Sequence, residues 1–80
     1  MARYYFHLHE CGEVTPDEEG LECSSLDAVR REAVSAARAV MCAELSEGRL
    51  CLSCHIEVED SAGQIALTVP FREVVALSGL

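Results

Sequence analysis

One segment of this 80-residue chain, residues 24–47, has the 3.6-residue periodicity of an amphipathic helix, and segments with the two-residue periodicity of strands stand on both sides of it. Its apolar side chains share one helical face: Leu26, Val29, Ala33, Ala36, Ala37, Val40 and Met41. Alanine makes up much of this stripe, and small side chains allow a helix to lie close against a sheet. The pattern therefore predicts a single long helix packed on one face of a small sheet.

Both ends of this helix carry recognisable signals. Ser24 and Asp27 have the spacing of a capping box, with Ser24 as the N-cap residue. We expect the helix to run to about Glu47, because Gly48 is suited to the left-handed conformation that ends many helices.

The first residues alternate between two faces, as in a half-buried strand. One face carries Tyr4, Phe6 and Leu8, and the other carries Arg3, Tyr5, His7 and His9. Residues 10–20 hold glycine, proline and most of the acidic side chains, so we expect a loop there. A short second strand at 21–23 is expected to return beside the first.

Residues 55–71 show the clearest hairpin pattern. The side chains expected to face inward are Ile56, Val58, Ile65, Leu67 and Val69. A turn at 60–63, with Gly63 free to take a positive φ, separates the two strands. Pro70 has no N–H to give to a sheet and should end the second strand, and one or two helical turns should follow at 71–77.

These elements predict one domain over residues 1–80 of the α+β class. The expected order is β-β-α-β-β, with a small antiparallel sheet, one long helix packed on one of its faces and a short C-terminal helical turn. The opposite face of the sheet, which carries Tyr5, His7, His9, His55 and Thr68, should meet solvent or a second subunit.

The charge of the chain argues against several function classes. The formal net charge is −8, from 14 acidic residues and 6 arginines. Six of the acids lie between residues 10 and 22, where there is no basic residue. We therefore expect no nucleic-acid partner, because that class of protein needs clustered positive charge.

We also expect no membrane span and a cytoplasmic location. The start of the chain has no uncharged apolar stretch of the length found in signal peptides. The weakly polar run at 33–45 is interrupted by Arg38 and Glu44. In the cytoplasm the five cysteines would be reduced, and their odd number fits poorly with a closed set of disulfides.

Several segments together resemble a known family. The chain opens with Met1-Ala-Arg-Tyr-Tyr-Phe-His7, and its acidic loop contains Pro16-Asp-Glu-Glu-Gly20. Its hairpin begins with Ile56-Glu-Val-Glu-Asp and ends with Thr68-Val-Pro-Phe71. With the alanine-rich helix, these segments resemble a family of short proteobacterial proteins of unknown function that begin M-x-R-Y-Y-F-H. The resemblance implies a small bacterial α+β domain with no assigned activity, and it carries over no catalytic residue.

The most specific chemical motif is Cys51-Leu-Ser-Cys54-His55. It has the pattern of a c-type haem attachment site, but haem needs both thiols on one helical turn, and His55 opens a strand pattern. A redox dithiol would sit at a helix N-terminus, and this pair precedes a strand. The spacing also fits half of a zinc site, whose other ligands would come from elsewhere in the chain. We expect no cofactor, with one alternative: zinc held by Cys51, Cys54 and His55.

The outward face of the first strand is the candidate binding surface. It carries Tyr5, His7 and His9, and no serine or carboxylate stands at a spacing that completes a catalytic set with them, so we assign no catalytic residue. The leading hypothesis is a non-enzymatic interaction or regulatory module that binds a protein partner or a second copy of itself as a homodimer. The alternatives are zinc binding through Cys51 and Cys54, and a small enzyme that uses His7 and His9.

Overall fold

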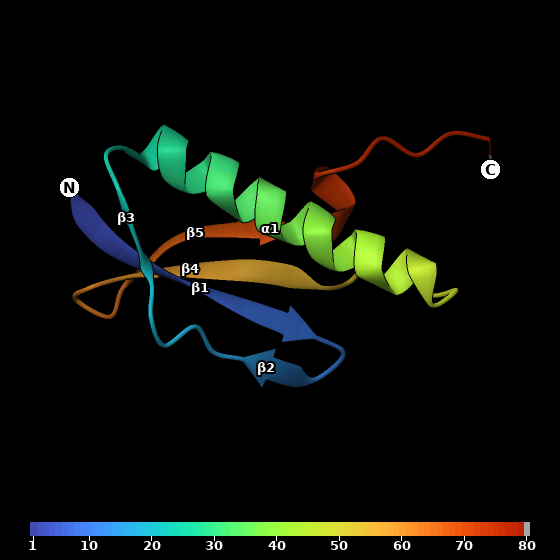
Figure 1. Cartoon of the computed structure of the whole chain (residues 1–80), viewed down its shortest axis with the longest axis horizontal. Helices are drawn as coiled ribbons and strands as arrows, with labels where there is room; N and C mark the ends of the chain where they lie inside the picture. The colour runs from blue at the N-terminus through green and yellow to red at the C-terminus, as the bar shows by residue number, and fades with distance from the viewer. Residues whose placement is uncertain (80) are drawn as a thin grey trace.

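The structure is a computed structural model that describes residues 1–79. Its elements in chain order are β1 (Ala2–Glu10), β2 (Glu13–Thr15), β3 (Leu21–Cys23), α1 (Leu26–Ser46), β4 (His55–Asp60), β5 (Ile65–Pro70) and a 3-10 turn, η1 (Phe71–Glu73) (Figure 1). The strands form one antiparallel sheet in the order β2-β1-β4-β5, and β3 also pairs with β1. The predicted α+β class, with one helix and an antiparallel sheet, is confirmed.

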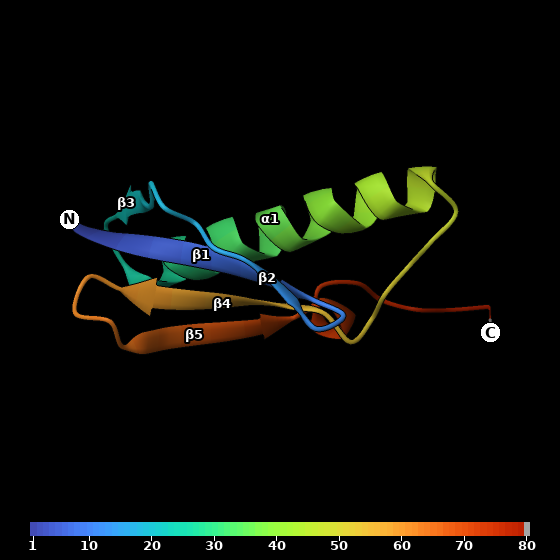
Figure 2. The same ribbon diagram turned by 90° about the horizontal axis from the view of Figure 1, so that it is seen from below.

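The helix lies along one face of the sheet (Figures 1 and 2). The buried core lies between the helix and this face. The buried residues of α1 are Val29, Ala33, Ala37 and Met41, and they pack against Ile56, Val58, Val69 and Phe71 of the C-terminal half. Leu26 was expected in this stripe and is 60% exposed instead. It occupies the first helical position, about one turn before Val29, where contact with the core begins.

The N-terminus of α1 starts one residue later than predicted. The N-cap is Ser25, whose Oγ accepts a hydrogen bond from the Ala28 N–H at 3.1 Å. The predicted capping box of Ser24 and Asp27 is therefore wrong, because the extended backbone of Ser25 turns its own hydroxyl onto the free N–H groups. Asp27 lies in the first turn, where its charge is favourable. At the other end, Gly48 takes a φ of 81°, as expected.

The loop predicted for residues 10–20 contains an additional strand. Glu10 and Glu13 pair across a two-residue turn formed by Cys11 and Gly12, whose φ angles are 42° and 85°. Two positive φ angles are typical of the type I′ turn of tight hairpins. The order is therefore β-β-β-α-β-β, and β2 was missed because it is three residues long, exposed throughout and shows no inward apolar side.

The C-terminal hairpin has one irregularity that the sequence pattern did not show. Val58 pairs with Leu67, and the next residue, Glu59, pairs with Ile65, so Ala66 is an extra residue in β5. The bulge moves Ile65 to the outer face, where it is 50% exposed. The expectation that Ile65 faces the core is therefore wrong.

The rest of this hairpin agrees with the prediction. Asp60 accepts backbone hydrogen bonds from Ala62 and Gln64 in the turn, and Gly63 has a φ of 83°. Pro70 is the last residue of β5. The helical turn predicted after it is η1, which begins at the fully buried Phe71.

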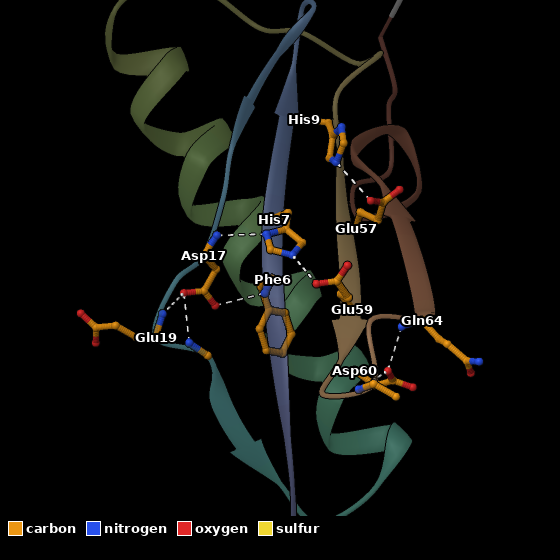
Figure 3. A network of polar contacts seen from close by, with 11 residues as sticks. Phe6, His7, His9, Asp17, Glu19, Glu57, Glu59, Asp60 and Gln64 are labelled. Atoms are coloured by element: carbon orange, nitrogen blue, oxygen red, sulfur yellow. Dashed lines mark hydrogen bonds and ion pairs between the residues drawn. The ribbon is translucent and has the colours of Figure 1, made fainter.

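One edge of β1 is shared by two short strands, and a carboxylate fills the gap between them. Leu8 pairs with Thr15 of β2 and Tyr4 with Leu21 of β3, which leaves Phe6 without a strand partner on that side. The Phe6 N–H donates instead to Asp17 Oδ2 at 3.1 Å (Figure 3).

The same carboxylate also orders its own loop. Its Oδ1 atom accepts from the N–H groups of Glu19 and Gly20 at 3.3 and 3.2 Å. Asp17 thus replaces the hydrogen bond that a continuous edge strand would make with β1 and closes the loop around itself.

His7 ties this loop to β4 across β1. The Asp17 N–H donates to His7 Nδ1 at 3.0 Å, and His7 Nε2 lies 3.4 Å from Glu59 Oε1 (Figure 3). Because Nδ1 accepts a hydrogen bond, the neutral ring carries its proton on Nε2, toward Glu59. Both nitrogens of His7 are therefore used inside the molecule.

Asp17→Ala is expected to lower the free energy of unfolding by about 1–3 kcal/mol, because the Phe6 N–H loses its acceptor. Urea denaturation measures the change. The matched control is Glu18→Gln, an exposed residue of the same loop, for which we expect a change within about 0.5 kcal/mol. Equal effects of the two substitutions would contradict the assigned role.

The contribution of Asp17 is also expected to depend on pH. Partial burial alone raises the pKa of Asp17, but the N–H groups of Phe6, Gly20 and Glu19 outweigh it, and the net effect lowers the pKa. An aspartate with a lowered native pKa stabilises the fold above its ordinary pKa of about 3.9, and this stabilisation is lost as the pH falls below it. The stability difference between the wild type and Asp17→Asn should therefore be largest at neutral pH and shrink toward about pH 3. A difference that is constant over this range would refute the argument.

Gly20→Ala is expected to destabilise more than Gly63→Ala. Both glycines have positive φ angles, 73° and 83°, so an alanine at either is strained by about 1–2 kcal/mol. A Cβ at Gly20 would also lie 2.9 Å from the Tyr4 carbonyl oxygen, whereas one at Gly63 meets nothing within 4 Å. Urea midpoints should place Gly20→Ala at least about 1 kcal/mol below Gly63→Ala. The opposite order would show that the loop yields freely at Gly20.

Candidate functional site

Three thiols from two distant parts of the chain meet at one end of the sheet. Cys11 lies in the turn between β1 and β2, and Cys51 and Cys54 lie in the non-helical link between α1 and β4. Their Sγ atoms all lie within 4.8 Å of one another. The antiparallel pairing of β1 with β4 explains the meeting, because it places the residues that follow β1 beside those that precede β4. We call these three residues the thiol cluster.

The thiol cluster combines exposed and buried sulfur atoms. Cys11 Sγ lies 3.5 Å from Cys51 Sγ, and Cys51 Sγ lies 3.2 Å from the hydroxyl of Ser53. Cys54 is 1% exposed, and its carbonyl oxygen accepts from the Phe71 N–H at 2.9 Å. The buried thiol is thus fixed by the fold, while the other two are accessible from solvent.

The three thiols differ in acidity. Hydrogen bonds from Cys54, then Ser53 and then Cys11, lower the pKa of Cys51 to about 7. Burial, and then the neighbouring Cys51, raise the pKa of Cys54 to about 12. The hydrogen bond with Cys51 and its charge raise the pKa of Cys11. Cys51 is therefore the thiol with the lowest pKa of the three. The thiols of Cys54 and Cys11 form hydrogen bonds with it.

Cys11 has an unusual backbone conformation. Its φ of 42° is the only positive φ among the non-glycine residues that the structure describes. This position of a type I′ turn is normally taken by asparagine, aspartate or glycine. Strained backbone at a residue whose side chain joins a cluster of ligands is a frequent feature of functional sites.

The surroundings of the thiol cluster are acidic. Glu10, Glu13 and Glu44 line a surface depression together with Cys11 and Cys51, and Arg49 is the basic residue of its lining. Partial burial, and then the neighbouring Glu44, raise the pKa of Glu10. Within residues 1–79, the Oε1 atom of Glu44 is buried and has no hydrogen-bond partner. The depression therefore concentrates negative charge beside the sulfur atoms.

A second group of ligands lies on the face of the sheet opposite α1. His9 of β1 is directly opposite His55 of β4, and Glu57 follows two residues later. The two imidazole rings are stacked, with centroids 4.5 Å apart and planes 14° from parallel. Glu57 Oε1 lies 3.4 Å from His9 Nε2 (Figure 3). We call His9, His55 and Glu57 the histidine cluster.

The structure sorts the candidate site residues into different groups. It keeps Cys51 and Cys54 together, adds Cys11, and places His55 with His9 rather than with the thiols. His55 and Cys54 are adjacent in sequence, but one faces outward while the other is buried in the core. Cys11 is absent from the predicted set of Cys51, Cys54 and His55, and it reaches the other two thiols because β1 lies beside β4.

The residues of the candidate binding surface also differ in their surroundings. Tyr5, His7 and His9 all lie on the outer face, opposite Glu59, Glu57 and His55 of β4. His7 is bound to the Asp17 loop and faces Glu59, whereas His9 belongs to the histidine cluster. The two histidines that look equivalent in sequence therefore have different surroundings.

Comparison with known proteins identifies the family of this chain and no activity. Over residues 1–79, the helix is not long and apolar enough to cross a membrane. The curated proteins give no match, and the solved structures give none. One family model matches residues 3–72, a range that contains both clusters. The chain therefore belongs to the family described as Domain of unknown function (DUF6894).

Proposed function

We propose that this domain binds a zinc ion through the thiolates of Cys11, Cys51 and Cys54. The observation that carries the proposal is the convergence of three thiols within 4.8 Å, although Cys11 is 40 residues from Cys51 in sequence. Thiolates are ligands that zinc prefers, and three of them at one point are more specific than the pair that the sequence shows.

The distances between the sulfur atoms support tetrahedral coordination. Zinc–sulfur bonds of about 2.3 Å place two tetrahedral ligands about 3.8 Å apart. Cys11 and Cys51 are 3.5 Å apart, and all three sulfur atoms lie within 4.8 Å. Small side-chain rotations therefore suffice to bring the three atoms around one ion.

The charge of the neighbourhood supports a cation. Glu10, Glu13 and Glu44 line the depression that contains Cys11 and Cys51, against one basic residue, Arg49. Glu44 also lies close enough to Glu10 to raise the pKa of Glu10, and a bound cation would relieve the repulsion between the two carboxylates. The residues present therefore fit a zinc ion in both ligand type and charge.

Three protein ligands leave a fourth coordination position. Structural zinc sites normally have four protein ligands, whereas sites with three keep one position for water or another molecule. Here that position would be filled by water, by a neighbouring carboxylate or by a ligand from outside. The proposal is thus a zinc-binding domain with one exchangeable position, in place of the ligand set of Cys51, Cys54 and His55 suggested by the sequence.

The other sequence-based hypotheses stay predictions. The hypothesis of an interaction module rests on the face that carries Tyr5, His7 and His9. Both ring nitrogens of His7 on that face already have partners within the molecule. The hypothesis of a small enzyme requires His7 and His9 to act as a pair. In the structure His7 contacts Asp17, whereas His9 contacts Glu57. The thiol cluster is therefore the feature on which the proposed function depends.

Protein purified without an affinity tag is expected to contain about one zinc per chain by elemental analysis. Cys11→Ser, Cys51→Ser and Cys54→Ser should each lower the zinc content by about one ion per chain under the same conditions, because a serine hydroxyl is a poor zinc ligand. Substitution of Co²⁺ gives a second readout, since thiolate coordination produces an intense charge-transfer absorption.

The matched control is Cys42→Ser. Cys42 is an exposed free cysteine on α1, outside the thiol cluster. Its removal should leave the zinc content unchanged. A zinc-free wild type that also takes up no zinc or cobalt when supplied, or a zinc content that is the same in Cys11→Ser and the wild type, would refute the proposal.

A further inference from the structure

The histidine cluster presents a ligand set that the thiol cluster does not explain. We propose that His9, His55 and Glu57 form a second metal site, on the outer face of the sheet, for a divalent transition-metal ion that favours imidazole ligands. The site uses no thiol, so metal binding there can be tested independently of zinc binding at the thiol cluster.

The backbone places these three ligands in register. His9 and His55 are direct partners in the pairing of β1 with β4, and Glu57 lies two residues beyond His55 on the same face of its strand. Each residue offers a ligand atom, and these atoms lie within 4.8 Å of one another. Because the ligands project from paired strands rather than from loops, little backbone movement is needed to bring them to one ion.

The local polar contacts leave ligand capacity unused. One oxygen of the Glu57 carboxylate, Oε1, lies 3.4 Å from His9 Nε2. His55 makes no side-chain hydrogen bond to any residue of the described chain, although it is only half-exposed and lies against the ring of His9. A divalent ion would give a partner to a lone pair of each imidazole and to the carboxylate at once.

The chemistry of the set differs from that of three thiolates. Two imidazoles and one carboxylate form the ligand set of many catalytic zinc sites and of non-haem iron sites, which keep open positions for water or substrate. Imidazole suits zinc, copper, nickel and iron. No helix of the described residues covers this face, so the open positions would meet solvent (Figure 2).

His7 provides an internal comparison. It lies on the same strand and the same face as His9, two residues earlier. Its Nδ1 atom accepts from the Asp17 N–H, and its Nε2 atom faces Glu59 (Figure 3). A metal ion would have to break these contacts to bind His7, whereas the ring of His55 is free of them.

The test is a zinc titration of the tag-free protein, followed through the ring nitrogen signals of the three histidines in NMR spectra. We expect the ring nitrogens of His9 and His55 to shift and those of His7 to stay unchanged. The titration is run on the wild type and on Cys51→Ser, so that uptake by the thiol cluster is separated from uptake by the histidine cluster.

Variants test the ligand set by calorimetry. His9→Gln, His55→Gln and Glu57→Gln should each weaken binding at this site at least about tenfold, by analogy with the cost of disturbing metal-site partners. Glu59→Gln, on the same strand and face, should not weaken it. If all three histidines shift together, or if neither His9 nor His55 shifts at any zinc concentration the protein tolerates, the site does not exist. Because the ring signals are read in the wild type, this conclusion does not depend on the folding of any variant.

Discussion

The hydrogen bond from the Phe6 N–H to the Asp17 carboxylate holds the N-terminal half of this domain in place. Without it, the Phe6 N–H would lack a partner between β2 and β3, and the loop that joins them would be held to β1 only through His7 and Arg3. On its other edge β1 pairs directly with β4 from Tyr4 to His9, in one continuous register. That register places His9 opposite His55 and brings Cys11 to Cys51, so both clusters of ligands depend on it.

The same interaction joins two of the segments that carry the family resemblance. The two N-terminal segments that carry the resemblance, Met1–His7 and Pro16–Gly20, are the segments that Asp17 joins. Gly20 is required there because its positive φ and the nearby Tyr4 carbonyl leave no room for a side chain. These residues maintain the fold, whereas the family model, over residues 3–72, also spans both clusters.

The sequence predicts the fold well where an apolar repeat extends over many residues. It predicts poorly where one residue determines the end of a helix or the face of a strand. The helix and the C-terminal hairpin follow from repeated apolar spacing. The N-cap was misplaced by one because two serines stand side by side, and only the backbone angles of Ser25 distinguish them. Ile65 was assigned to the core because a bulge changes the face of a strand without changing its composition.

At the candidate site, prediction from the sequence is limited in the same way, because residues far apart in the sequence meet there. Cys51 and Cys54 are visible as a pair in the sequence, but Cys11 joins them only through the register of β1 and β4. His55 follows Cys54 directly, and that adjacency is misleading because successive side chains along extended backbone point to opposite faces. The alternation sends the sulfur of Cys54 into the core and the imidazole of His55 to the outer face. It therefore places the thiols and the imidazole and carboxylate groups in two separate clusters, each with the kind of side chain that different metal ions favour.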